Sequence, residues 1–223
     1  MAPSVVSARQ EHLQELAGVF ARAFADEPDQ RALFPDPHRR AALVPLFGAA
    51  TVHLSYLDGK VIETTPALSC VSIWTRPGQA TSWQSWVRSV PRLWAMARRA
   101  SPGDVRRFAG FVARLEGRRH ELLPQPHWCL DVLAVLPERQ RFGLGAVLAR
   151  HGLHRADADG RPVYVETDGE DKAVFYGKLG FELAEYAVDY PPMSIPTWRM
   201  IRPPQPAATA ARTRLRPAAT SVP

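Results

Sequence analysis

Three residues with a fixed spacing, Gln140, Gly143 and Gly145, stand between an apolar run and a helical pattern. The run at 128–135 reads as a buried strand, and a helix is predicted over 143–159. Where a strand leads into a helix through small residues, backbone N–H groups stay unpaired at the positive end of the helix dipole. Such a turn suits a pyrophosphate, and glycine lets the backbone approach it closely. Alone, this pattern is a weak signal, because a plain glycine turn also explains it.

Two carboxylates could act as the general base of a transfer reaction. Asp131 lies in the middle of the apolar run, where an ionised side chain is costly unless it faces a wet pocket or a partner. An edge position or a structural ion pair is the alternative explanation for Asp131. Glu166 lies at the C-terminal end of a second strand, predicted over 162–167, where such a sheet opens.

Apolar periodicity predicts the elements that position these residues. We expect strands at 5–8, 60–64, 68–74, 128–135, 162–167, 181–190 and 197–201, and helices at 13–25, 39–56, 79–100, 104–123, 143–159 and 172–179. The strands at 60–64 and 68–74 should form an antiparallel hairpin, and the two strands that flank the helix at 143–159 should pair in parallel. Pro91 should kink or break its helix. The tryptophans of that helix are expected in the core, or lining an acceptor pocket.

The length of 223 residues fits one folded domain, which we expect at 1–202. The remaining segment, 203–223, is rich in Pro, Ala, Thr and Arg and is expected to be disordered. No apolar run is long enough for a membrane span, and the N-terminus lacks the features of a secretory signal. Cys70 and Cys129 lie in apolar runs and are expected to be buried, reduced thiols, which suits a cytoplasmic protein.

The charge pattern argues against a nucleic-acid-binding protein. The net charge is +6 and the isoelectric point about 9.8, but the positive residues fall in helical pairs and in the tail. His151 and His154 are three residues apart on a helix, without a Cys, Asp or Glu to complete a metal site. We therefore predict no metal, no nucleic acid and no membrane as partners.

A second segment strengthens the interpretation of the glycine turn as a ligand-binding site. Residues 163–168 read VYVETD and residues 173–181 read AVFYGKLGF. Together the two segments resemble the Gcn5-related N-acetyltransferase (GNAT) superfamily, and most closely its puromycin N-acetyltransferase-like branch. The resemblance covers about 4–202 and is tightest over 128–202. It implies an α/β fold with a mixed, mostly antiparallel central sheet, a parallel splayed pair of strands and flanking helices.

The same resemblance implies acetyl-CoA as the co-substrate and assigns roles to residues. The turn would bind the pyrophosphate, although Arg141 stands where the family often has glycine. The exposed backbone of the strand at 128–135 would bind pantetheine and act as the oxyanion donor. Lys172 replaces an asparagine of close relatives and could contact phosphate. The cofactor-binding residues are therefore Leu133, Ala134, Val135, Gln140, Arg141, Phe142, Gly143, Leu144, Gly145, Ala146, Lys172 and Phe175.

Tyr176 occupies the position of the family's general acid, which protonates the leaving thiolate. The catalytic residues are then Tyr176 with Asp131 or Glu166 as base, although many relatives use a water chain and no dedicated base. We predict transfer of an acetyl group to a primary amine of a small molecule, such as an antibiotic or natural-product amine, by direct attack on the thioester. The alternatives are a protein N-terminal or lysine acetyltransferase and an idle acyl-CoA-binding module. Both a monomer and a homodimer stay open.

Overall fold

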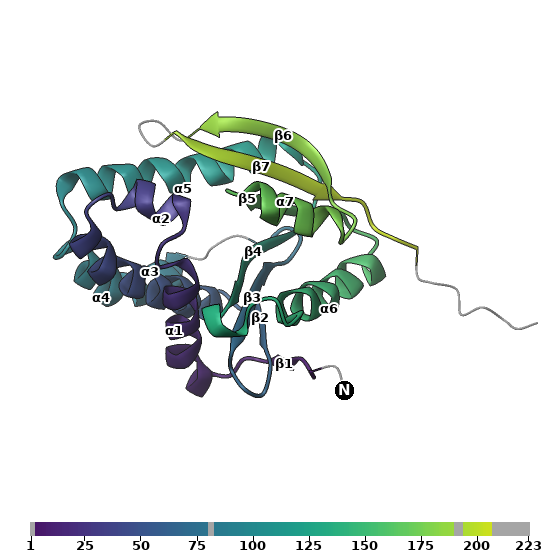
Figure 1. Cartoon of the computed structure of the whole chain (residues 1–223), viewed down its shortest axis with the longest axis horizontal. Helices are drawn as coiled ribbons and strands as arrows, with labels where there is room; N and C mark the ends of the chain where they lie inside the picture. The colour runs from purple at the N-terminus through teal and green to yellow at the C-terminus, as the bar shows by residue number, and fades with distance from the viewer. Residues whose placement is uncertain (1–2, 80–82, 190–193, 207–223) are drawn as a thin grey trace, which may run out of the picture.

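A seven-stranded mixed sheet with helices on both faces forms the centre of the molecule (Figure 1). The computed structural model describes residues 3–79, 83–189 and 194–206. The strand order is β1-β2-β3-β4-β5-β7-β6, and only β4 and β5 pair in parallel. The strands are β1 Val6–Ser7, β2 Val61–Thr64, β3 Cys70–Thr75, β4 Trp128–Val135, β5 Val163–Thr167, β6 Glu182–Asp189 and β7 Ile195–Arg202.

The α-helices are α1 Leu13–Phe24, α2 Pro28–Leu33, α3 Pro37–Leu57, α4 Trp83–Ala97, α5 Pro102–Leu122, α6 Leu144–Ala158 and α7 Glu170–Gly177, with short 3₁₀ turns at Gln10–His12 and Pro137–Arg139. The predicted α/β architecture, with a mostly antiparallel sheet and one parallel pair, is confirmed. Each expected strand and helix is present to within a few residues at its ends. Residues 80–82 and 190, which the predictions included, lie outside the described ranges, as does the tail from 207 onward.

Helix α2 was not expected, because no element is predicted between the helices at 13–25 and 39–56, where Pro28, Pro35 and Pro37 indicate a break in the helical pattern. Pro28 instead occupies the first turn of α2, where its fixed φ angle suits a helix and its missing N–H costs nothing. The helix ends before Pro35, and Asp36 caps the next helix by accepting a hydrogen bond from the Arg39 N–H at 2.8 Å. The break is therefore two helix boundaries with one short helix between them.

Helix α4 differs from the prediction in two ways. Pro91 lies inside the helix, which continues through it, so the expected break does not occur. Val90 and Trp94 are 55% and 64% exposed, which makes the prediction of a core position wrong for Trp94. The helix turns another side inward, where Met96 packs in a cluster with Leu33. The side chains of the other two tryptophans of α4 lie outside the described part of the chain.

The helices divide between the two faces of the sheet (Figure 1). A bulge in β4 lets this strand contribute side chains to the packing on both faces. The register pairs Ile73 with Val132 but Trp74 with Leu130, so Asp131 is an extra residue in β4. An extra residue reverses the alternation of side chains beyond it. Leu130 therefore packs in the cluster of α6 and α7, whereas Val132 packs in the cluster of α1.

The parallel pair is joined at one end only. Its register contains two pairs, Trp128 with Val163 and Cys129 with Tyr164, and the Trp128 N–H donates to the Pro162 carbonyl at 2.9 Å. Beyond Cys129 the two strands diverge, and β5 continues in a ladder with β7. From the bulge to its C-terminal end, β4 is paired with β3 on one edge only. Its other edge, on the side of β5, has no strand beside it within the described structure.

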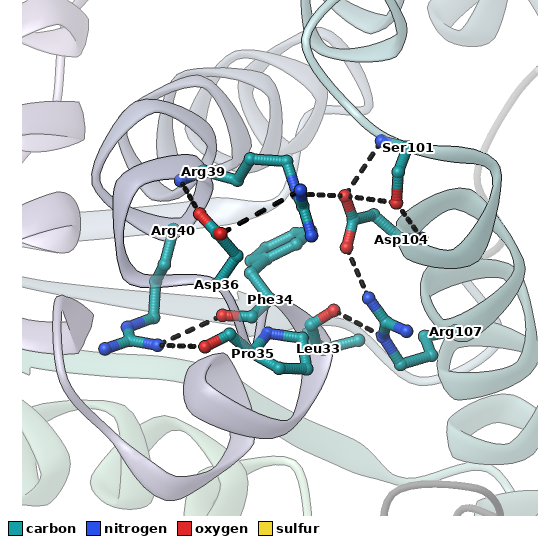
Figure 2. A network of polar contacts seen from close by, with 9 residues as sticks. All are labelled: Leu33, Phe34, Pro35, Asp36, Arg39, Arg40, Ser101, Asp104 and Arg107. Atoms are coloured by element: carbon teal, nitrogen blue, oxygen red, sulfur yellow. Dashed lines mark hydrogen bonds and ion pairs between the residues drawn. The ribbon is translucent and has the colours of Figure 1, made fainter.

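A polar network fixes α2 and α3 to the start of α5 (Figure 2). The fully buried carboxylate of Asp104 accepts hydrogen bonds from the backbone and hydroxyl of Ser101, both at 2.8 Å, and pairs with Arg39 and Arg107. Arg107 also donates to the carbonyl oxygen of Leu33 at 2.8 Å, at the end of α2. Asp104 thus positions the arginine that anchors the C-terminal end of α2.

Candidate active site

A cleft of about 1750 Å³ occupies the gap between β4 and β5 and extends under the helices on the α1 side. The turn before α6, the free edge of β4, and α7 line one part of it, and aromatic side chains of α3 and α5 line another. The cleft contains every residue that the sequence indicated for catalysis, and all those indicated for the cofactor except Phe142. Phe142 is 76% exposed.

The turn before α6 adopts the backbone that its glycines predict. Gly143 precedes the helix with φ of +81°, in the left-handed region that favours glycine. Arg141 also lies there, with φ of +67°, which explains why glycine would suit this position. The Val147 N–H makes the first backbone bond of the helix, to Gly143 at 3.0 Å. The N–H groups of the preceding first turn have no acceptor within the helix and face the cleft side of the turn.

The space around Gly145 bears on whether the protein itself needs glycine in this turn. A Cβ atom there would meet Val135, Leu133 and Phe175 at 3.6–3.9 Å, which is ordinary van der Waals contact. The packing of the protein therefore does not require glycine at this position. A ligand lying on the first turn of α6 would require it, because a Cβ would occupy the space that a pyrophosphate needs.

The free edge of β4 offers backbone groups to an extended ligand. The Leu136 N–H donates to the Ser69 carbonyl at 3.0 Å, on the β3 side. Because backbone groups alternate between the two edges of a strand, those of Leu133 and Val135 face the gap. The side-chain amide of Gln140 donates to the Val135 carbonyl at 3.2 Å, so the Val135 N–H and both backbone groups of Leu133 are the ones left facing the gap.

Tyr176 lies on α7 and lines the cleft. Its ring packs edge-on between Phe175 and Phe181, with centroid distances of 5.1 and 5.5 Å, and is 8% exposed. Burial, followed by the negative charge of Asp168, raises the pKa of the Tyr176 phenol above its ordinary value. The hydroxyl therefore carries its proton at neutral pH, as a general acid must.

Asp131 is held by cations at the bulge of β4. Its carboxylate accepts from Lys60 at 2.9 Å and from the hydroxyl of Thr75, and Arg119 lies 3.6 Å away. The side chain is 20% exposed and lines the cleft. The sequence left open whether Asp131 faces a pocket or forms a structural ion pair, and the structure shows both for this residue.

Glu166 is also paired. It accepts a hydrogen bond from the Tyr164 hydroxyl at 2.9 Å and lies 3.5 Å from the fully buried guanidinium of Arg199. Arg199 in turn contacts Glu185 at 2.7 Å. Glu166 lines the cleft, but its ion pair with Arg199 stabilises the carboxylate and so makes it a weaker proton acceptor.

Lys172 points to carboxylates. Its ammonium pairs with Glu27 and with Asp168, the latter at 2.6 Å, and so links α7 to the segment that begins α2. A phosphate would have to compete with both carboxylates. The phosphate contact of Lys172 stays a prediction, and in the structure this ammonium lies beside the carboxylates of Glu27 and Asp168.

Asp29 was not identified from the sequence, since it lies in the segment interpreted as a break. It is in the first turn of α2, is partly buried and lines the cleft. Burial, and then the nearby charge of Asp168, raises the pKa of the Asp29 carboxyl to about 7. The available signal was the combination of Pro28 and an acidic residue at the start of a helix.

Predictions for the cysteines and for His151 can also be compared with the structure. Cys70 and Cys129 are buried and free, as expected, and Cys129 lines the cleft. His151 hydrogen-bonds Glu63 at 2.9 Å on the far side of the sheet. Within residues 3–79, 83–189 and 194–206, no helix combines the length and apolarity of a membrane span.

The profile of the acetyltransferase (GNAT) family matches residues 61–181, which include the bulged strand, the turn and Tyr176. A mycothiol acetyltransferase from Kytococcus sedentarius is 45% identical over 96 residues, which is 38% of this chain and 32% of that protein. The match thus spans about a third of the length of this curated relative.

Solved structures share the fold over most of its length. One from Corynebacterium glutamicum, described as histone acetyltransferase HPA2 and related acetyltransferase, has a TM-score of 0.68 at 23% identity and covers 93% of this chain and 99% of its own. A putative arylalkylamine N-acetyltransferase 7 from the yellow fever mosquito has a TM-score of 0.58 at 12% identity, covering 90% and 87%. The Drosophila melanogaster polyamine N-acetyltransferase has 0.54 at 14% identity, covering 90% and 100%. At these identities, the likeness shows the fold.

Proposed function

Because this chain belongs to the acetyltransferase (GNAT) family, we propose that it transfers the acetyl group of acetyl-CoA to a primary amine of a small molecule. The observation that carries the proposal is the gap beside β4, with an open helix N-terminus at one end and Tyr176 beside it. Such a gap receives an extended ligand whose diphosphate lies on the helix. Acetyl-CoA, when bound, supplies the thioester.

Residues of this chain would hold the donor along the gap. The N–H groups of 144–146 bind the diphosphate, and the free edge of β4 binds the two amides of pantetheine as an added strand would. The N–H groups of the same strand lie where they can stabilise the negative charge that develops on the thioester oxygen. Phe175 packs against the protein core beside Gly145 and closes the gap from the α7 side.

The transfer needs two proton movements. The neutral amine attacks the thioester carbonyl carbon, a carbon–nitrogen bond forms, and the nitrogen gives up a proton. The carbon–sulfur bond then breaks, and the leaving thiolate takes the proton of the Tyr176 hydroxyl. Tyr176 recovers a proton from solvent, so that the products are an amide, coenzyme A thiol and one proton released from the acceptor ammonium.

A small acceptor fits the walls of the cleft. Phe47, Met96, Phe108 and Phe111 line the part that lies away from the turn, and they come from α3, α4 and α5. Helices that cover the acceptor side enclose a small molecule more readily than a protein chain. Three similar proteins are named for the acetylation of mycothiol, arylalkylamines and polyamines, which are small molecules. The sequence resemblance to the puromycin N-acetyltransferase-like branch likewise favours a natural-product amine.

Calorimetry and thiol release test the proposal together. We expect acetyl-CoA to bind the protein, and free thiol to appear when an aminonucleoside, arylalkylamine or polyamine is added. The same assay with peptides that carry a free N-terminus or a lysine should release little thiol. Thiol release with peptides alone would favour a protein acetyltransferase, and binding without release for any amine would favour an idle acyl-CoA-binding module.

A further inference from the structure

An acidic wall borders the cleft where α2 meets α7. It consists of Glu27, Asp29 and Asp168, with Lys172 beside them. We propose that the carboxylate of Asp29, together with the side-chain carbonyl of Gln30, binds the ammonium group of the acceptor and receives its proton. The inference rests on the proposed function, because it assigns the acceptor end of the same cleft.

Asp29 differs in its partners from three other carboxylates of the cleft. Asp131 pairs with Lys60, Glu166 with Arg199, and Asp168 with Lys172. Within the described part of the chain, Asp29 accepts hydrogen bonds only from its neighbour Gln30, at 2.7 Å from the backbone and 3.1 Å from the side-chain amide. Among the described residues, no lysine or arginine lies within ion-pair distance of it. A carboxylate in this setting lacks the cation that its charge calls for.

Gln30 supplies a second, independent indication of a ligand. It lines the cleft and is 1% exposed, and its amide nitrogen is used by Asp29. Its carbonyl oxygen, Oε1, is buried and has no hydrogen-bond partner among the described residues. An unsatisfied buried acceptor costs stability unless a donor arrives. An ammonium group donates up to three hydrogen bonds and can satisfy Gln30 and Asp29 together.

The orientation of α2 is fixed from both ends. The Asp29 N–H donates to the Asp168 carboxylate at 3.2 Å, and Lys172 bridges Asp168 and Glu27. At the other end, Arg107 holds the Leu33 carbonyl. These contacts keep Asp29 on the side of the cleft that also holds Tyr176.

The groups that face Asp29 favour a cation between them. Asp168 from the β5–α7 loop and Glu27 before α2 are acidic, Tyr176 from α7 is neutral, and Lys172 from α7 is the cation whose charge lowers the pKa of the Asp29 carboxyl. With that pKa at about 7, Asp29 can accept a proton near neutral pH. The acceptor ammonium transfers one proton to the carboxylate, and the resulting neutral amine keeps the lone pair that attacks the thioester. The carboxylic acid returns the proton to solvent after the product leaves.

Titration calorimetry with primary amines tests this assignment without turnover. The probes are 2-phenylethylamine and 1,4-diaminobutane, added to the protein saturated with coenzyme A at pH 6.5 in two buffers of different ionisation enthalpy. We expect release of about 0.5–0.8 proton per amine bound, because Asp29 is about three-quarters protonated at pH 6.5 and the bound cation converts it to carboxylate. Asp29→Asn should release none and bind at least 10-fold more weakly. The neutral isostere 2-phenylethanol should release no proton from either protein.

Asp26→Asn is the matched control, since Asp26 is exposed, pairs with Arg31 and lies outside the cleft lining. It should leave amine affinity and proton release unchanged. Equal affinity of Asp29→Asn and wild type, or no amine binding by wild type, overturns the inference. If Asp29→Asn binds amines as tightly as wild type and wild type still releases thiol, the inference fails and the proposed function stands. Proton-linked amine binding that Asp29→Asn abolishes, without thiol release by wild type, supports the inference and refutes the proposed function.

Discussion

The side-chain amide of Gln140 donates to the backbone carbonyl of Val135 at 3.2 Å, across five residues of the turn. This bond ties the loop that precedes α6 to the end of β4. It also occupies the one carbonyl at the end of the strand that would otherwise face the gap. The two parts of the donor site, the helix N-terminus and the strand edge, therefore share a fixed relative position.

Replacing Gln140 by methionine should weaken acetyl-CoA binding about fivefold, because one hydrogen bond contributes about 1 kcal/mol. The side chain keeps its length, so the fold should lose little stability. Calorimetry with acetyl-CoA measures the change. Gln14→Met, on the exposed surface of α1, is the control. An unchanged affinity of Gln140→Met would show that the bond does not position the turn.

Gly145→Ala should separate donor binding from folding. A Cβ makes only ordinary contacts in the protein, so the free energy of unfolding should change by less than about 0.5 kcal/mol. Acetyl-CoA affinity should fall at least 10-fold, because the methyl group occupies the space above the first turn of α6. Denaturant unfolding and calorimetry give the two values.

Gly110→Ala in α5 is the control for this helix substitution, since open space surrounds its Cβ position and it lies outside the cleft lining. It should retain full acetyl-CoA affinity. If Gly145→Ala also binds normally, the diphosphate does not lie on the first turn of α6.

Tyr176→Phe should lower kcat about 100- to 1,000-fold while the KM for acetyl-CoA stays near its wild-type value. The ring keeps its edge-on contacts with Phe175 and Phe181, so stability should be preserved. Because burial raises the pKa of the Tyr176 phenol, wild-type activity should show no basic limb from this group below pH 9. Steady-state thiol release across pH checks both statements, and a kcat within threefold of wild type would remove Tyr176 as the acid.

Asp29→Asn should stabilise the fold at high pH. The folded-state pKa of Asp29 is raised from its ordinary value of 3.8 to about 7, so its ionisation opposes folding as pH rises from 4 to 7. The variant should be about 2 kcal/mol more stable than wild type at pH 8 and equal to it at pH 3.5, with water in the cleft reducing the full effect. Urea unfolding at both pH values measures this, and equal stability at pH 8 would contradict the raised pKa.

Asp104→Asn should destabilise the protein by about 3 kcal/mol at pH 7, because Arg39 and Arg107 lose a buried partner. Burial alone would raise the pKa of the Asp104 carboxyl, but the hydrogen bonds from Ser101 and the two arginines lower it overall. A lowered pKa means that the stabilisation is present above pH 4 and is lost as pH falls further. The difference from wild type should therefore shrink below pH 4 in urea unfolding.

The KM for the amine acceptor should also change in Asp104→Asn. Since the network holds the end of α2, its loss should raise the KM for the amine and leave acetyl-CoA affinity unchanged. An effect on acetyl-CoA instead would place the network on the donor side.

The sequence by itself determined the elements of the fold and indicated the turn that we propose as the donor end of the site. Apolar residues repeat every two positions in a strand and every 3.6 in a helix, so both patterns can be recognised within a short stretch of sequence. The backbone freedom that glycine gives to the turn before α6 is likewise a property of single residues. Gln140, Gly143 and Gly145 could therefore be identified from the amino-acid pattern alone, together with the strand and the helix on either side. The departure at Arg141 was also visible there, and its positive φ explains why glycine is common at this position.

Only the tertiary structure decided which groups surround each carboxylate of the cleft, and the proposed acceptor end depends on those surroundings. Three features depend on residues 56 to 139 positions away in sequence: the bulge at Asp131, the cation Lys60 beside it, and the position of Asp29 next to Asp168. A pKa is set by burial and by neighbouring charge, and neither is encoded in local spacing. For the same reason periodicity found α4 but could not say which of its apolar sides would face solvent.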